Sequence, residues 1–185
     1  MSITIQDLIF SYPDKTIFKN YSVKFDNGVF YSLTAPSGKG KTTLFRLITG
    51  LEKPDSGKID IIGKLAYMFQ EDRLFPNLTV LENIMLTSDN KDSAKAVLQV
   101  LGIIDEANSY PDSLSGGMKR RVALARTLLA KSDNVILDEP FVGLDEAARD
   151  KAIELIKKMC YGKTLIISTH DPSEREFCDE HVILM

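Results

Sequence analysis

The sequence predicts an α/β protein with a parallel sheet, an antiparallel β flank and a helical insert. Three observations lead to this prediction: strand-like segments fill the first third, helical patterns fill the middle, and strands alternate with helices in the last third. With 185 residues, 44% of them hydrophobic, the chain can bury one core and is too short for two ordinary domains. We therefore expect a single domain spanning residues 1–185.

The first elements are expected to be strands. The segments ITIQDLIF, YSVKF and VFYSLTA are separated by the turn-forming groups YPDK and DNG, which predicts a small antiparallel layer. A Gly-rich turn follows from residue 36. We then expect a helix over about 41–50, a PDSG turn, and the strands KIDII and KLAYMF.

The middle of the chain is expected to be helical. Thr79 and Glu82 have the spacing of a capping box, and the segment of about 79–130 that they open predicts a helical subdomain at approximately 72–130. Next come VILDEP, a helix over about 146–160, TLIIST, a short helix near Glu174, and HVILM. This alternation of strands and helices is typical of a parallel sheet.

Bulk composition excludes several classes of protein. Lys and Arg total 23 against 26 Asp and Glu, so the chain lacks the basic excess of a nucleic-acid-binding protein. The two cysteines, Cys160 and Cys178, favour a reducing compartment over a disulfide framework. The first residues do not resemble a signal peptide, and no apolar run reaches the roughly 20 residues that cross a bilayer. A membrane role would therefore need a partner.

A Gly-rich segment carries the first chemical signal. Residues 35–43, APSGKGKTT, follow an apolar strand and open a helix, where backbone amides and the helix dipole attract phosphate. Lys41 would add a charge at the β and γ phosphates and Thr42 would hold Mg²⁺. An ordinary Gly-rich turn is the alternative. The predicted nucleotide-binding residues here are Ser37, Gly38, Lys39, Gly40, Lys41, Thr42 and Thr43.

A second signal is the pair of acids that ends the apolar strand VILDEP. Asp138 is expected to orient the Mg²⁺ shell, and Glu139 to polarise the attacking water as general base. Each acid alone could be a solvated strand end. Together with the Gly-rich loop, the pair indicates a P-loop nucleoside triphosphatase core.

The third signal is a second helix start suited to anions. Ser115, Gly116 and Gly117 precede the amphipathic helix KRRVALARTLLA, and a plain N-cap is the alternative. Two half-sites in one chain can both be completed when two subunits pair head to tail. The basic cluster Lys119-Arg120-Arg121 is interpreted as a solvated helix face or counter-charge, with no catalytic part.

These blocks, in this order, resemble the nucleotide-binding subunit of ATP-binding cassette (ABC) transporters over nearly the whole chain. The resemblance implies that Ser115 and Gly117 reach the γ-phosphate of ATP bound by a partner subunit. Met118 and Ala35 depart from the family pattern, which has Gln and Gly there. The run SGGMKRRVALARTLLA resembles importer subunits for nitrate, sulfonate and taurine.

Four further residues take roles from this resemblance. Gln70 would link the active site to membrane subunits and sense Mg²⁺ and the attacking water, and His170 would contact the γ-phosphate. Tyr12 would stack on adenine, or be a core tyrosine. Asp145 would cross the dimer interface, cap a helix, or do both.

The resemblance implies an ATPase that dimerises on ATP and drives solute movement, with import favoured. Its expected partners are transmembrane permease subunits and a second, identical nucleotide-binding subunit, and no nucleic acid. The expected location is cytoplasmic and peripheral, on the inner face of the cell membrane. Two alternatives remain: a soluble ABC-type ATPase switch, and a nucleotide-dependent module that does not hydrolyse ATP.

Overall fold

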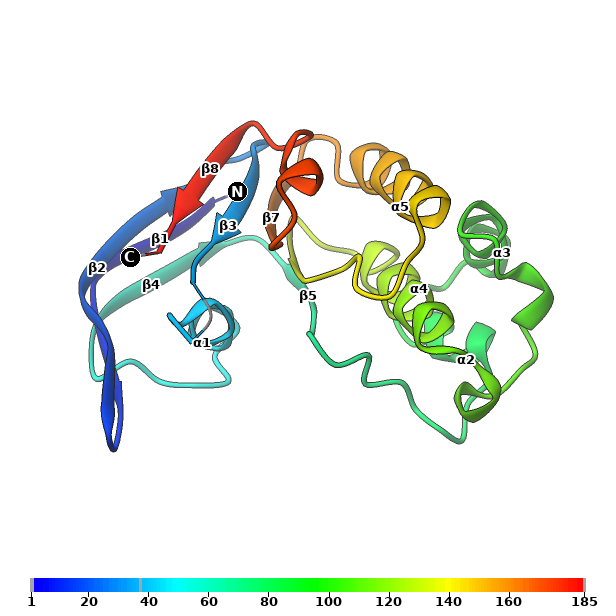
Figure 1. The fold of residues 1–185 in the computed structure, drawn as a ribbon, viewed down its shortest axis with the longest axis horizontal. Helices are drawn as coiled ribbons and strands as arrows, with labels where there is room; N and C mark the ends of the chain where they lie inside the picture. Colours follow the sequence, from blue (N-terminus) through cyan, green and yellow to red (C-terminus); the bar gives the residue numbers. More distant parts are fainter. Residues whose placement is uncertain (1, 37, 185) are drawn as a thin grey trace. The chain divides into compact units, whose positions relative to one another are not determined.

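The computed structural model describes residues 2–36 and 38–184, which form two compact units (Figure 1). The first, here called the sheet unit, comprises residues 1–67, 132–138 and 162–185. The second, the helical unit, comprises residues 68–131 and 139–161. The assignment of the whole chain to one domain, with a helical subdomain at about 72–130, stays a prediction.

The antiparallel flank of the sheet unit has the strand order β2-β1-β4. Its strands are β1 (Ser2–Tyr12), β2 (Lys15–Phe25) and β4 (Ser56–Ile62). Ile3 of β1 pairs with Phe25 of β2 on one side and with Ile61 of β4 on the other. Alternate β1 residues such as Ile3 and Ile5 are buried, because successive side chains of a strand point to opposite faces.

The second sheet of the unit has the order β5-β6-β7-β3-β8, and its β6–β7, β7–β3 and β3–β8 pairs are parallel. Its strands are β3 (Phe30–Thr34), β5 (Leu65–Met68), β6 (Asn134–Asp138), β7 (Thr164–Ser168) and β8 (Glu180–Ile183). The alternating strands expected in the last third are therefore confirmed as a parallel sheet.

One strand lies in a different sheet from the one expected. The segment VFYSLTA was predicted for the antiparallel layer, but its β3 lies between β7 and β8 in the parallel sheet, and β4 completes the antiparallel layer. Tyr31, Ser32 and Leu33 are buried in succession, as in a strand covered on both faces. Continuous burial, rather than position in the first third, was the informative signal.

Helix α1 (Lys41–Ile48) starts directly after Gly40 and packs Leu44 and Phe45 into the core of the sheet unit. It ends two residues earlier than expected. Gly50 adopts a left-handed φ of 73°, and its N–H donates to the Leu47 carbonyl, as glycine commonly does at helix ends.

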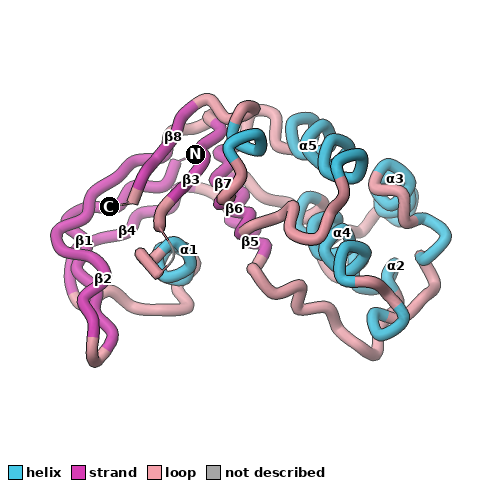
Figure 2. Tube along the Cα trace, viewed as in Figure 1, coloured by secondary structure: helices cyan, strands magenta, loops and turns pink. Residues whose placement is uncertain are grey.

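The helical unit contains four α-helices joined by loops (Figure 2). They are α2 (Val80–Met85), α3 (Lys91–Val100), α4 (Gly116–Leu128) and α5 (Glu146–Met159), with short 3₁₀ turns at Ile104–Glu106 and Pro111–Ser113. The predicted capping box is present: the Thr79 hydroxyl accepts from the Glu82 N–H, and the Glu82 carboxylate accepts from the Thr79 N–H. Within the described part of the chain, no helix is both long and apolar enough to span a bilayer.

Candidate nucleotide site

The phosphate loop joins β3 to α1 in the sheet unit. Gly38 and Gly40 have φ of 74° and 94°, a left-handed conformation that glycine adopts without steric cost. A Cβ on Gly40 would lie 2.5 Å from the Ile17 Cγ2 atom, so the loop needs glycine there for space as well. Ser37, also predicted to bind nucleotide, lies outside the described residues.

Lys41 is the first residue of α1 and is 9% exposed. Its Nζ donates to the Ala35 carbonyl at 3.1 Å and lies 3.0 Å from His170 Nε2. Because a charged amine can only donate, Nε2 accepts in this pair. The sheet unit thus brings together Lys41 and His170, both predicted to contact the γ-phosphate.

Asp138 ends β6 and is 1% exposed. Its carboxylate accepts from the Thr42 hydroxyl at 3.2 Å and from the Ser168 hydroxyl at 2.5 Å. Thr42 comes from the start of α1 and Ser168 from the end of β7, so the strand ends of the parallel sheet meet the phosphate loop at this carboxylate. Thr43, the next loop residue, is buried in the first turn of α1.

The Thr42 and Asp138 oxygens fit Mg²⁺, a hard cation that binds one or two protein oxygens together with substrate phosphates and water. Among residues 2–36 and 38–184, no group of three or more His, Cys, Asp and Glu is placed to hold a metal ion. Gln70, the other predicted Mg²⁺ residue, belongs to the helical unit.

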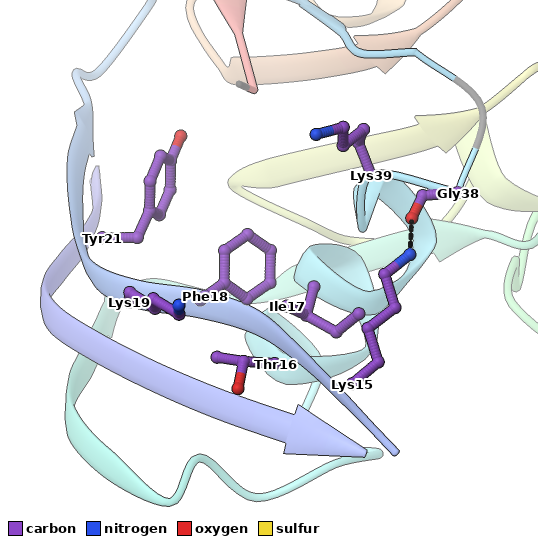
Figure 3. A pocket seen from close by; sticks show the side chains of 8 residues that line it. All are labelled: Lys15, Thr16, Ile17, Phe18, Lys19, Tyr21, Gly38 and Lys39. Atoms are coloured by element: carbon purple, nitrogen blue, oxygen red, sulfur yellow. Dashed lines mark hydrogen bonds between the residues drawn. The ribbon is translucent and has the colours of Figure 1, made fainter. Parts of the chain in front are cut away.

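A pocket of about 400 Å³ lies beside the phosphate loop in the sheet unit (Figure 3). Strand β2 supplies most of its lining, and Lys15 Nζ donates to the Gly38 carbonyl at 3.0 Å. Burial raises the pKa of Tyr21 to about 12, so its hydroxyl stays protonated at neutral pH. The lining residues are Lys15, Thr16, Ile17, Phe18, Lys19, Tyr21, Gly38 and Lys39.

The β2 side of this pocket was missed by sequence reasoning, because strand register decides which β2 side chains face the loop. Tyr12, predicted to stack on adenine, is half-buried at the end of β1. Its ring packs edge-on against Phe10, with 5.0 Å between the ring centroids. Tyr12 therefore packs partly against the core of the sheet unit. Its stacking on adenine stays a prediction.

A second pocket, of about 300 Å³, lies within the helical unit. It brings together Gln70, Glu139, Gly116 and Gly117, which were predicted as site residues from three separate parts of the sequence. Asp72, Arg120, Val142 and Gly143 complete the lining. Gly117 packs so closely that a Cβ there would lie 2.5 Å from the Gly143 carbonyl oxygen.

Two predicted site residues act as helix caps. The Ser115 hydroxyl accepts from the Met118 N–H at 3.3 Å at the start of α4, and Asp145 Oδ1 accepts from the Ala148 N–H at 2.8 Å at the start of α5. The sequence offered helix capping as one role for each of these residues, and both of them do cap a helix. Their predicted roles at a dimer interface stay predictions.

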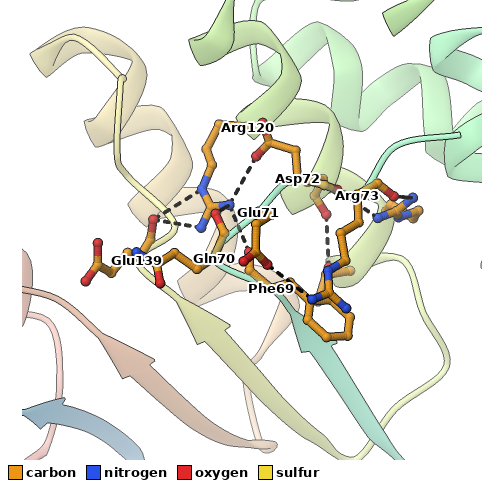
Figure 4. Close-up of polar contacts among 10 residues, drawn as sticks. Phe69, Gln70, Glu71, Asp72, Arg73, Arg120 and Glu139 are labelled. Atoms are coloured by element: carbon orange, nitrogen blue, oxygen red, sulfur yellow. Dashed lines mark hydrogen bonds and ion pairs between the residues drawn. The ribbon is translucent and has the colours of Figure 1, made fainter. Parts of the chain in front are cut away.

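Arg120 is a residue whose position differs from the expectation. The basic cluster was interpreted as a solvated helix face or counter-charge. Arg120 is not solvated, being 3% exposed, but it does pair with the Asp72 carboxylate, and it also donates to backbone carbonyls of residues 69, 70 and 139 (Figure 4). Its partners come from segments far apart in the sequence, so the charge pattern of the helix alone could not reveal them.

A strand, a glycine-rich loop and a helix, with a buried acid at the end of a neighbouring strand, define the class of P-loop nucleoside triphosphatases. The chain belongs to the ABC transporter family, whose family model matches residues 18–142. It is thus an ATP-binding and ATP-hydrolysing subunit of a transporter.

Individual relatives agree with this assignment. The aliphatic sulfonates import ATP-binding protein SsuB 1 of Nocardia farcinica (strain IFM 10152) is 35% identical over 191 residues, covering 100% of this chain and 78% of that protein. A dimeric ATP-binding cassette in a post-hydrolysis state with ADP and Pi superposes with a TM-score of 0.88 at 27% identity, covering 98% of this chain and 94% of that one. A bacterial Atm1-family ABC exporter with ATP bound gives 0.91 at 26% identity, covering 100% of this chain and 37% of that chain.

Proposed function

We propose that two copies of this chain close over two ATP molecules, and that their reopening after hydrolysis drives import of a solute through permease subunits. The observation that carries the proposal is the Asp138 carboxylate, which the phosphate-loop residue Thr42 contacts at 3.2 Å. This places an acidic strand end at a loop built for phosphate, as phosphoryl transfer requires. Import is supported by the name of the SsuB relative.

Each residue of the phosphate loop has its own proposed role in binding ATP. Backbone amides of Gly38, Lys39 and Gly40 would surround the phosphates, Lys41 would add its charge, and Thr43 holds the first turn of α1 in the core. Tyr12 stacks on the adenine. Thr42, Asp138 and Gln70 would hold Mg²⁺, which when bound neutralises charge on the β and γ phosphates.

The acids and the polar side chains around the reacting phosphate have separate tasks. Glu139 accepts a proton from the attacking water, and Gln70 orients that water beside it. His170, which follows β7 and lies next to Lys41, would contact the γ-phosphate. The pocket that Gln70 and Glu139 share in the helical unit supports their common task.

The second subunit completes each site. Ser115, Gly116 and Gly117 at the start of α4 offer N–H groups to the γ-phosphate held by the partner, and Asp145 lies in the interface. Because the γ-phosphate touches both subunits, ATP favours the closed dimer and ADP does not, which is the difference in binding that a cycle needs. The dimeric cassette that resembles this chain supports the assembly.

The permease would dock on the segment 70–86. Phe75 and Leu86 are 55% and 53% exposed there, and such apolar side chains suit a docked helix. The subunit is then peripheral, on the cytoplasmic face of the cell membrane. We expect no nucleic acid among the partners, because the net charge of −3 lacks the basic excess that nucleic-acid binding needs.

The Glu139→Gln variant tests the hydrolytic cycle. We expect ATP turnover to fall by about 100-fold or more, because the base is lost while binding is spared. Gel filtration with ATP and Mg²⁺ should show a stable dimer. The control is Glu146→Gln, an exposed acid in the first turn of α5, which should turn over ATP normally. A Glu139→Gln protein that stays monomeric with ATP, or that keeps its turnover, contradicts the proposal.

The membrane partner is tested separately. The tagged chain, purified from its native membranes in mild detergent, should bring a multi-spanning membrane protein that mass spectrometry identifies. An extracytoplasmic binding protein in the same complex supports import. Ribosomal or DNA-repair partners would instead indicate a soluble ATPase switch.

A further inference from the structure

Arg120 of α4 lies between the two segments that carry the proposed catalytic groups, all within the helical unit (Figure 4). On one side its Nη1 atom donates to the Phe69 and Gln70 carbonyls, each at 2.9 Å, and to Asp72 Oδ1 at 3.1 Å. On the other side Nε and Nη2 donate to the Glu139 carbonyl at 3.2 and 2.8 Å. One rigid, planar group therefore sets the distance between the backbone at Gln70 and the backbone at Glu139.

Glu139 needs such support because its backbone is in an uncommon conformation. Its φ is 51°, in the left-handed region that residues with a Cβ rarely adopt. The paired donors from Arg120 hold the carbonyl of this residue and so fix the peptide plane next to the Glu139 side chain. Gln70, Arg120 and Glu139 line the same pocket of the helical unit, so the guanidinium lies beside both proposed catalytic residues.

We propose that Arg120 is a positioning residue that fixes Glu139 and Gln70 relative to each other. The inference rests on the proposed roles of these two residues. The geometry requires an arginine: its planar fork donates in several directions at once, whereas a lysine amine is a single point charge on a flexible stem. Its burial also keeps water from competing for the carbonyls.

The same helix offers a matched control. Arg126 donates to the Asp72 carbonyl at 3.1 Å and to the Arg73 carbonyl at 3.0 Å, so it holds the segment that contains Gln70. Among the described residues, the hydrogen bonds of its side chain go to this segment alone, while its backbone carbonyl accepts from the Thr87 hydroxyl. Replacing Arg126 removes support from the segment and leaves the bonds to the Glu139 carbonyl in place.

The experiment compares Arg120→Lys with Arg126→Lys for kcat, KM for ATP, ATP affinity and melting temperature. For Arg120→Lys we expect kcat to fall by about 10- to 100-fold, because a small misplacement of a catalytic group has an effect of this size. KM and ATP affinity should stay within about twofold, since ATP contacts in the sheet unit are untouched. Arg126→Lys should keep kcat within about twofold even if its melting temperature falls equally.

Two results would overturn the inference. One is an unchanged kcat in Arg120→Lys, and the other is an equal kcat loss in both variants that follows melting temperature, which indicates a purely structural role. If Arg120→Lys does not fold, Asp72→Asn replaces it, because Asp72 is partly exposed and anchors the guanidinium on the Gln70 side. It should lower kcat several-fold with KM unchanged, and no change in kcat contradicts the inference.

Failure of the inference can be told apart from failure of the proposed function. If Glu139→Gln abolishes turnover while Arg120→Lys does not lower kcat, Glu139 is the base and only the positioning role is wrong. If Glu139→Gln retains turnover, the proposed function itself fails. In the double variant, Arg120→Lys should add little to the loss caused by Glu139→Gln, because both changes remove the same contribution.

Discussion

Two lysines of the phosphate loop show how position decides what the same side chain can do. Lys41 is buried at the start of α1, with its amine held between the Ala35 carbonyl and His170. Lys39, two residues earlier, is exposed and lines the pocket beside β2. A held charge gains more from a bound phosphate than a mobile, solvated one, because less side-chain entropy is lost on binding.

This difference gives a paired prediction. Lys41→Ala should weaken ATP binding by about 10- to 100-fold, the size expected for losing a charge-assisted hydrogen bond of roughly 1.5–3 kcal/mol. Lys39→Ala should change the affinity by less than about threefold, as an exposed ion pair contributes little. Titration of a fluorescent ATP analogue measures both. Equal effects of the two substitutions would contradict the assigned roles.

The neighbouring glycines of α4 give a second residue-scale prediction. Gly117→Ala should lower the free energy of unfolding by about 1–3 kcal/mol, because its Cβ would overlap the Gly143 carbonyl oxygen. Gly116→Ala is the control, since a Cβ there meets no atom within 4 Å and alanine favours the helix. Urea denaturation of the two variants provides the comparison. If Gly116→Ala lowers the free energy of unfolding more than Gly117→Ala does, the inference that Gly117 is closely packed is wrong.

At the scale of elements, short helices depend on their caps. Helix α2 has six residues, too few to be stable alone, and its start is held by the reciprocal bonds of Thr79 and Glu82. These bonds from Thr79 lower the pKa of the Glu82 carboxyl below its ordinary value. The stability that this cap gives to α2 should therefore depend on pH.

The capping box predicts both a mutational and a pH effect. Thr79→Ala should reduce the free energy of unfolding by about 0.5–2 kcal/mol, and Thr79→Ser, which keeps the hydroxyl, should reduce it much less. Because the folded-state pKa of Glu82 is the lower one, its contribution is present above the ordinary carboxyl pKa and is lost as pH falls through the folded value. Melting curves of the wild type and Glu82→Gln should therefore converge at low pH. A constant difference at all pH values would contradict this linkage.

At the scale of the whole molecule, the two proposed acids belong to different units. Asp138 ends a strand of the sheet unit, and Glu139, the next residue, belongs to the helical unit. The proposed Mg²⁺ ligand and the proposed base are thus consecutive in the chain, while the two residues are held by different sets of contacts. Asp138 is held by Thr42 and Ser168, and the backbone of Glu139 by Arg120.

Nucleotide should stabilise the whole chain through these contacts. ATP with Mg²⁺ at 100 times its dissociation constant should raise the free energy of unfolding by about 2.7 kcal/mol, as for any ligand that binds only the folded state. Differential scanning fluorimetry should show a higher melting temperature that EDTA partly reverses. The Asp138→Asn variant should respond equally to ATP with and without Mg²⁺. If EDTA leaves the ATP-induced rise in the melting temperature of the wild type unchanged, the Mg²⁺ assignment is contradicted.

Local chemistry explains why much of the fold and the candidate site could be predicted. The phosphate loop needs its glycines and lysine in one short segment, and Asp138 and Glu139 follow directly on an apolar strand. The cap formed by Thr79 and Glu82 is likewise decided by residues three positions apart. In each case the residues of one motif are close together in the chain, so their spacing already predicts the local geometry.

By itself the sequence determined the α/β class, the order of strands and helices, and the segments that carry the chemistry. Only the tertiary structure decided that β3 belongs to the parallel sheet, that β2 lines a pocket beside the phosphate loop, and that Arg120 is buried against the Glu139 carbonyl. The physical reason is distance along the chain. Strand pairing, register and the partners of a long side chain depend on segments tens of residues apart, and no local pattern encodes which of them will meet.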